Sequence, residues 1–243
     1  LELAKTLSKK YNISLAARYF DPVFSFPGID IIRIPFFHTF KLGFKFTIPN
    51  PEFRKKLSEF DAILCFGGVL RAFGPLSKIK TPMIIDLYNP WIFESLEGGH
   101  SKSRENLLGN VKAFNEILKR GDFFICANKK QQDLYIGLLL SAGKIDPKIY
   151  KADPSLRNLI DIVPTGIPSA PPVHKKRVLK GIMPGISETD KIIVWWGGIW
   201  DWLDPLTTIE AMSLISEKRK DVKLIFFGTK PINPGSAPLK LVE

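Results

Sequence analysis

A double glycine, Gly197 and Gly198, follows an apolar run of strand formers over residues 192–196. A turn without side chains lets a ligand approach the backbone closely, and open parallel α/β sheets bind ligands at the carboxyl ends of their strands. The pair Asp204 and Pro205 then predicts the start of a helix, with Asp204 as its N-cap. This turn could therefore bind a phosphorylated ligand near the helix N-terminus. An ordinary tight turn between a strand and a helix is the structural alternative.

Aromatic and acidic residues occupy the loop between this turn and the helix. Trp200 and Trp202 could stack on a sugar or a base, or could fill a domain interface. Asp201 has no structural role in this pattern, so it is the better candidate for bonding a hydroxyl of a ligand. Thr229, which follows the next predicted strand, completes the candidate donor-binding set.

A second set of polar residues follows strands that come earlier in the chain. Asp86 ends the strand predicted within 81–90, where it could orient or deprotonate a hydroxyl or could cap a turn through Asn89. Lys129 could contribute positive charge to a phosphate or could simply be solvated. The candidates on this side of the molecule are Asp86, Asn89, Asn128, Lys129, Gly67 and Gly68.

Predicted strands and helices alternate along the chain, which indicates an α/β fold with a doubly wound parallel sheet. Prolines, glycines and basic residues in 169–190 predict a linker. We therefore expect a Rossmann-like domain over 1–168, with its first strand missing, and the start of a second such domain over 191–243. The segment 191–229 reads as strand, helix and strand.

The formal net charge of +11 belongs to the first part of the chain, because residues 1–180 hold 28 Lys and Arg against 16 Asp and Glu. A membrane surface, a nucleic acid and a phosphorylated substrate are candidate partners, and a solvated basic face is the alternative. No motif supports nucleic acid. The Phe- and Lys-rich segment 36–46 could lie on an anionic membrane or form a loop packed on the core. Cys65 and Cys126 are expected to be buried, reduced thiols, which favours a cytoplasmic location.

Four segments together resemble bacterial nucleotide-sugar glycosyltransferases of family 4. They are IIDLYNPWIFESLE (84–97), FFICANKKQQDLYIGLL (123–139), IDIVPTGIP (160–168) and VWWGGIWDWLDPLTTIEAM (194–212). The resemblance implies the GT-B fold, in which two Rossmann-like domains face a cleft. It also implies retaining transfer of a sugar from a nucleotide diphosphate to a glycan or lipid-linked acceptor, in cell-surface polysaccharide synthesis. Neither a cofactor nor a metal is expected.

The chain departs from this family in the donor turn and downstream of it. No Lys or Arg occurs between Lys191 and Lys218, where many family members hold the diphosphate with basic residues. Asp201 and Asp204 stand there instead and would repel a diphosphate. The resemblance places the family's E-x7-E glutamate pair further downstream than Glu243. We therefore expect a fragment that is inactive alone, acts at the inner face of the cell membrane, and could form a homodimer through exposed sheet edges. A non-catalytic two-lobed binding module is the competing interpretation.

Overall fold

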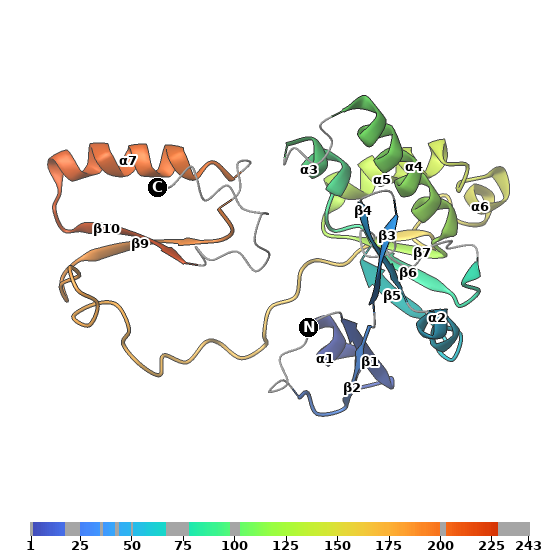
Figure 1. Ribbon diagram of the computed structural model, residues 1–243, viewed down its shortest axis with the longest axis horizontal. Helices are drawn as coiled ribbons and strands as arrows, with labels where there is room; N and C mark the ends of the chain where they lie inside the picture. Colours follow the sequence, from blue (N-terminus) through green and yellow to red (C-terminus); the bar gives the residue numbers. More distant parts are fainter. Residues whose placement is uncertain are drawn as a thin grey trace. The chain divides into compact units, whose positions relative to one another are not determined.

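The computed structural model describes residues 2–17, 25–34, 36–41, 44–49, 51–66, 78–97, 103–199 and 203–227 of the 243-residue chain. The chain is an α/β protein that divides into two compact units (Figure 1). The first unit comprises Leu1–Phe93 and Ser103–Ser169, and the second comprises Glu94–Lys102 and Ala170–Glu243. Each unit is described by itself below.

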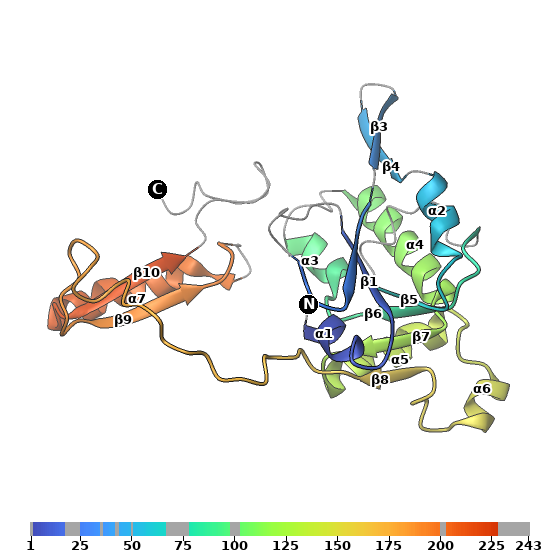
Figure 2. The same cartoon turned by 90° about the horizontal axis from the view of Figure 1, so that it is seen from below.

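A parallel sheet of four strands, in the order β5-β6-β7-β8, lies at the centre of the first unit (Figure 2). Its strands are β5 (Ile63–Phe66), β6 (Met83–Asp86), β7 (Phe123–Cys126) and β8 (Ile160–Ile162). Asp86 pairs with Phe66 on one side and with Ile125 on the other. The carboxyl ends of the strands therefore meet at one edge of the sheet. The predicted α/β fold with a parallel sheet is confirmed for these four strands.

Helices between the strands pack on the sheet and share in the apolar core. They are α3 (Trp91–Glu97), α4 (Arg104–Arg120), α5 (Lys129–Ser141) and α6 (Pro147–Ala152). Helix α4 begins at the N-cap Ser103 and buries Phe114, Ile117 and Leu118. On β6 alternate side chains, Met83 and Ile85, are fully buried, as the two-residue period of a strand requires. The core is therefore built where these helices pack on the sheet.

Arg120 joins several segments at the amino ends of the strands. Its guanidinium donates to the carbonyls of Ile79 (Nη2···O 2.8 Å) and Thr81 (2.5 Å) and to Asp122 Oδ2 (2.7 Å). The same Asp122 oxygen accepts the N–H of Met83 at 2.8 Å. Burial raises the pKa of Asp122, but the Met83 N–H and the Arg120 guanidinium outweigh it and hold that pKa below its ordinary value. This network fixes the loop that leads into β6.

The N-terminal part of the first unit contains two further small sheets. After α1 (Glu2–Leu7), β1 (Ile13–Ala17) pairs in parallel with β2 (Ile29–Arg33). The chain then forms an antiparallel hairpin of β3 (Phe36–Lys41) and β4 (Phe44–Pro49), followed by α2 (Pro51–Leu57). The alternative of a packed loop in 36–46 was wrong, because the described residues of this segment form a β-hairpin. The parallel strands also fall into separate sheets, because β1 and β2 pair only with each other among the described residues.

The second unit contains a strand, a helix and a strand, as the sequence pattern predicts. They are β9 (Lys191–Trp196), α7 (Pro205–Lys218) and β10 (Val222–Phe227), and the two strands pair in parallel with Trp196 opposite Phe227. Helix α7 lies along one face of the pair (Figure 1). We expected β9 to be covered on both faces, but Trp196 is 83% exposed and Ile193 and Val194 are also exposed. That expectation was wrong because α7 covers only one face.

None of the helices within the described residues has the length and apolar character needed to cross a membrane.

Candidate functional site

Asp86 is the last residue of β6 and therefore lies at the edge where the four parallel strands end. Its Oδ1 accepts the backbone N–H of Tyr88 at 2.9 Å, which orients the carboxylate within the loop. Burial raises the pKa of Asp86 above its ordinary value, although the hydrogen bond from Tyr88 acts in the opposite direction. A carboxylate with a raised pKa is a better proton acceptor at neutral pH than a solvated one. Asp86 thus has both the position and the basicity of a candidate general base.

Gln131 fixes the loop that follows Asp86 against the start of α5. Its Nε2 donates to the Tyr88 carbonyl at 2.8 Å, and its Oε1 accepts the Ala127 N–H at 2.8 Å. The two strand ends of β6 and β7 are therefore tied together by one side chain. Sequence reasoning missed Gln131, although a Gln three residues after the N-cap Asn128 is the spacing of a capping box.

Asn128 and Lys129 lie at the neighbouring strand end, as predicted, but both are engaged in local structure. The Asn128 side chain accepts the Gln131 N–H at 3.0 Å and caps α5. Lys129 Nζ forms an ion pair with Asp133 at 2.9 Å and donates to Gln132 Oε1 at 3.1 Å. Its side chain is largely exposed, so this pair is weak and the ammonium remains accessible to an anion.

Asn89 and the two glycines complete the predicted set on this side. The Asn89 carbonyl accepts the N–H of Trp91 at 2.8 Å, where α3 begins. Gly67 and Gly68 lie outside the described residues. The structure therefore brings Asp86, Asn89, Asn128 and Lys129 to adjacent strand ends of one sheet.

In the second unit, Gly197 and Gly198 follow β9 at the surface. Gly197 is exposed and Gly198 is half-buried. The Trp195 indole N–H donates to the Gly198 carbonyl at 3.3 Å and holds the turn against the strand. A side chain added at Gly197 would meet only ordinary van der Waals contacts, so the backbone here does not itself demand glycine. The turn is open to a ligand.

Asp204 caps α7, as the Asp-Pro pair predicts, and its carboxylate binds the first turn of the helix. Its backbone is left-handed (φ 50°), and its carboxylate accepts both the Thr207 N–H (3.2 Å) and the Thr207 hydroxyl (2.7 Å). The Thr207 hydroxyl and N–H hold the pKa of Asp204 below its ordinary value, so the carboxylate is ionised at neutral pH. This carboxylate therefore occupies the Thr207 N–H, and a phosphate near the helix N-terminus stays a prediction.

Trp196 is an exposed aromatic residue at the end of β9 that sequence reasoning treated as part of a buried strand. Its ring lies 5.5 Å from that of Phe227, centroid to centroid, and its outer face is open. The signal in the sequence was the position of Trp196 directly before the glycines. The predicted donor residues Trp200, Asp201, Trp202 and Thr229 lie outside the described residues.

The cysteines are free thiols, as expected: Cys126 is buried and Cys65 half-buried. Burial raises the pKa of Cys65 to about 12, against the opposing effect of Arg120. Among the described residues, no three His, Cys, Asp or Glu side chains are grouped so that they could hold a metal ion.

A comparison with models of known protein families found no match, and a search of curated proteins found no significant match.

The raised pKa of Asp86 predicts an unusual pH dependence of stability. A carboxyl group whose pKa is raised on folding contributes stability below its unfolded-state pKa, near 3.8, and loses that contribution as the pH rises through the folded value. Asp86→Asn should therefore raise the free energy of unfolding at pH 7, where the native carboxylate is charged, more than it does at acid pH. Urea denaturation at several pH values between about 3.5 and 8 measures this difference.

Asp161 on β8 provides a matched control of opposite sign. Its hydrogen bonds from Arg157 and from the Ile162 N–H hold its pKa below the ordinary value. Asp161→Asn should therefore lower stability at pH 7 and matter less as the pH falls through the folded pKa. If both variants changed stability with the same pH profile, the burial of Asp86 would not be the cause.

Proposed function

We propose that this chain is the acceptor-side domain and the beginning of the donor domain of a retaining GT-B glycosyltransferase. In this proposal a sugar moves from a nucleotide diphosphate to a hydroxyl of a glycan or lipid-linked acceptor. The protein would act in the cytoplasm, in cell-surface polysaccharide synthesis. The observation that carries the proposal is Asp86, a carboxyl with a raised pKa at the carboxyl end of a parallel strand.

On the acceptor side, Asp86 would accept a hydrogen bond from the attacking hydroxyl and take its proton as the new bond to the sugar forms and the bond to the nucleoside diphosphate breaks. Gln131 would act as a positioning residue, because it holds the Tyr88 backbone that orients Asp86. Lys129, exposed at the next strand end, would attract an anionic substrate. The basic first part of the chain supports an anionic partner, and an anionic membrane surface is the partner that a lipid-linked acceptor would require.

On the donor side, the open turn at Gly197 and Gly198 would receive the nucleotide diphosphate, with Trp196 available to stack on a base or sugar. The ionised Asp204 would repel phosphate from the start of α7. We therefore place the diphosphate at the glycine amides, and its charge would have to be balanced by groups beyond the described part of this turn.

A non-catalytic ligand-binding module is the second candidate, and one observation favours it. The described part of the donor turn, 191–199 and 203–217, offers no Lys or Arg after Lys191, and Asp204 occupies the Thr207 N–H. Nucleoside diphosphate released from a nucleotide sugar by the product of the complete gene distinguishes the two. Release that depends on an added acceptor supports transfer, whereas ligand binding without any release supports the module.

A further inference from the structure

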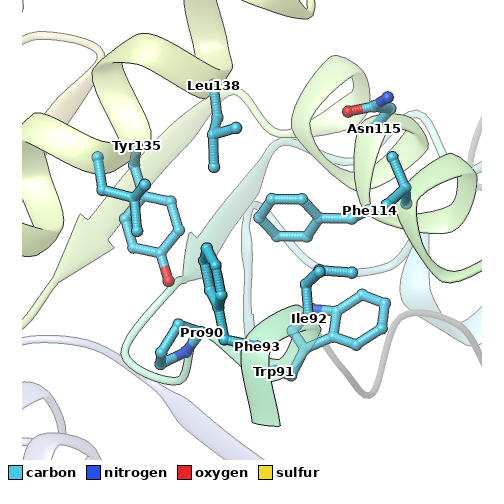
Figure 3. Close-up of a pocket in the computed structure, with 10 residues that line it drawn as sticks. Pro90, Trp91, Ile92, Phe93, Phe114, Asn115, Tyr135 and Leu138 are labelled. Carbon is cyan, nitrogen blue, oxygen red and sulfur yellow. The ribbon is translucent and has the colours of Figure 1, made fainter. Parts of the chain in front are cut away.

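An apolar pocket of about 130 Å³ lies among α3, α4 and α5 in the first unit. In Figure 3 the rings of Phe93, Phe114 and Tyr135 face a common space beside Leu138, with Pro90 and Trp91 nearby. Its lining is mainly apolar, with the amide of Asn115 and the hydroxyl of Tyr135 as polar groups. We call it the α3–α5 pocket.

Buried aromatic rings form its inner wall. The rings of Trp91 and Phe114 meet edge to face at 5.8 Å, and those of Phe114 and Tyr135 lie 6.4 Å apart. Phe114 and Tyr135 are both buried in the core of the unit. Because this wall is part of the packed core, the pocket is formed before a ligand arrives, which lowers the entropic cost of binding.

The mouth of the pocket is apolar as well. Phe93, which lines it, is 58% exposed, and Leu134 is also exposed. Leu108 lies one helical turn before the lining residue Val111 and is exposed too. Neighbouring exposed apolar side chains around a hollow mark a surface that an apolar partner covers.

The pocket begins beside the candidate acceptor site. Only the loop 87–90 separates Asp86 from α3, and Gln131 ties that loop to α5. On α5, Lys130 stands one turn before Leu134 and two before Leu138, so the three share one face of the helix. A ligand whose apolar end fills the pocket would therefore have its polar end near an exposed lysine, on the side of the sheet where Asp86 lies.

We propose that the α3–α5 pocket binds the hydrocarbon chain of a phosphate-bearing lipid acceptor, with Lys130 near the phosphate. This inference rests on the proposed function and narrows its acceptor to the lipid-linked class. A cavity of roughly 150 Å³ lined by Leu, Ile and Phe is large enough for one benzene molecule. The α3–α5 pocket would therefore hold about one five-carbon isoprenoid unit, while the rest of the chain covers Phe93 and Leu108.

Calorimetric titration with farnesyl phosphate below its micelle concentration tests the proposal, with methyl phosphate as the probe that has no long chain. Each buried methylene contributes about fourfold in affinity, so farnesyl phosphate should bind at least about tenfold more tightly than methyl phosphate. Leu134→Trp, which fills the mouth, should remove most of that advantage. Leu140→Trp is the matched control, because Leu140 is exposed on the same helix but does not line the pocket.

A second measurement does not depend on any variant. In the unmodified protein, nuclear Overhauser effects should connect the methyl protons of farnesyl phosphate to the ring protons of Phe93 and Phe114. Equal affinities for the two phosphates, equal losses in both tryptophan variants, or Overhauser effects only to residues elsewhere would overturn the proposal.

The test also separates this inference from the proposed function. If the protein binds nucleotide at Gly197 and Gly198 but does not bind farnesyl phosphate, the assignment of the pocket is wrong and the proposed glycosyl transfer is unaffected. Farnesyl phosphate binding without any nucleotide binding would overturn the acceptor role of the pocket together with the proposed function.

Discussion

Replacing Asp86 with asparagine should lower sugar transfer by the product of the complete gene by about 100- to 10,000-fold, the usual contribution of a positioned general base. The substitution keeps the size of the side chain and an oxygen that can accept the Tyr88 N–H, which in the native protein meets Asp86 at 2.9 Å. It removes the proton acceptor whose pKa burial has raised. The rate of nucleoside diphosphate release with saturating acceptor measures the loss.

The same chemical change at the opposite edge of the sheet is the control. Asp61 is exposed and precedes β5 at its amino end, so Asp61→Asn should leave the rate unchanged. Affinity for the nucleotide should be the same in both variants and in the native protein. A rate for Asp86→Asn within about threefold of the native rate would mean that Asp86 only shapes the loop.

Replacing Arg120 with methionine should lower the free energy of unfolding of the first unit by about 3 kcal/mol, because it leaves buried acceptors without partners. The Arg120 side chain is only 15% exposed and donates to the carbonyls of Ile79 and Thr81 as well as to Asp122. Methionine retains the apolar stem but provides no donor. Urea denaturation followed by circular dichroism measures the change.

Arg157→Met is the matched control for this prediction. Arg157 also pairs with a carboxylate, Asp161, at 2.8 Å, but its side chain is 70% exposed. A solvated pair of this kind contributes little to stability, so the loss should be much smaller than for Arg120→Met. Equal losses of stability in the two variants would show that the carbonyl contacts of Arg120 do not stabilise the loop before β6.

Local sequence patterns were sufficient to predict much of the framework. The apolar runs ending at Asp86 and Cys126 do form neighbouring parallel strands, and the Asp-Pro pair does begin α7. These features depend on periodicity and capping within a few residues of chain. The domain roles and the family resemblance remain predictions.

Features that depend on contacts between distant segments could not be read from the sequence. Arg120 meets Ile79 across 41 positions of the chain, and Gln131 meets Tyr88 across 43. No local pattern encodes such a partner. The contact of Asp204 with Thr207 follows from the Asp-Pro pair, but the left-handed backbone at Asp204 was not predicted.

The most direct test of the account is the amide spectrum of the ¹⁵N-labelled chain during titration with UDP and with GDP. We expect one of these nucleotides to shift the amide signals of Gly197 and Gly198 and the indole signal of Trp195 in a saturable way. The basic segment 174–180 serves as an internal control for binding driven by charge alone. Shifts confined to that segment, or no shifts with either nucleotide, would contradict the assignment of the glycine turn as a nucleotide-sugar site.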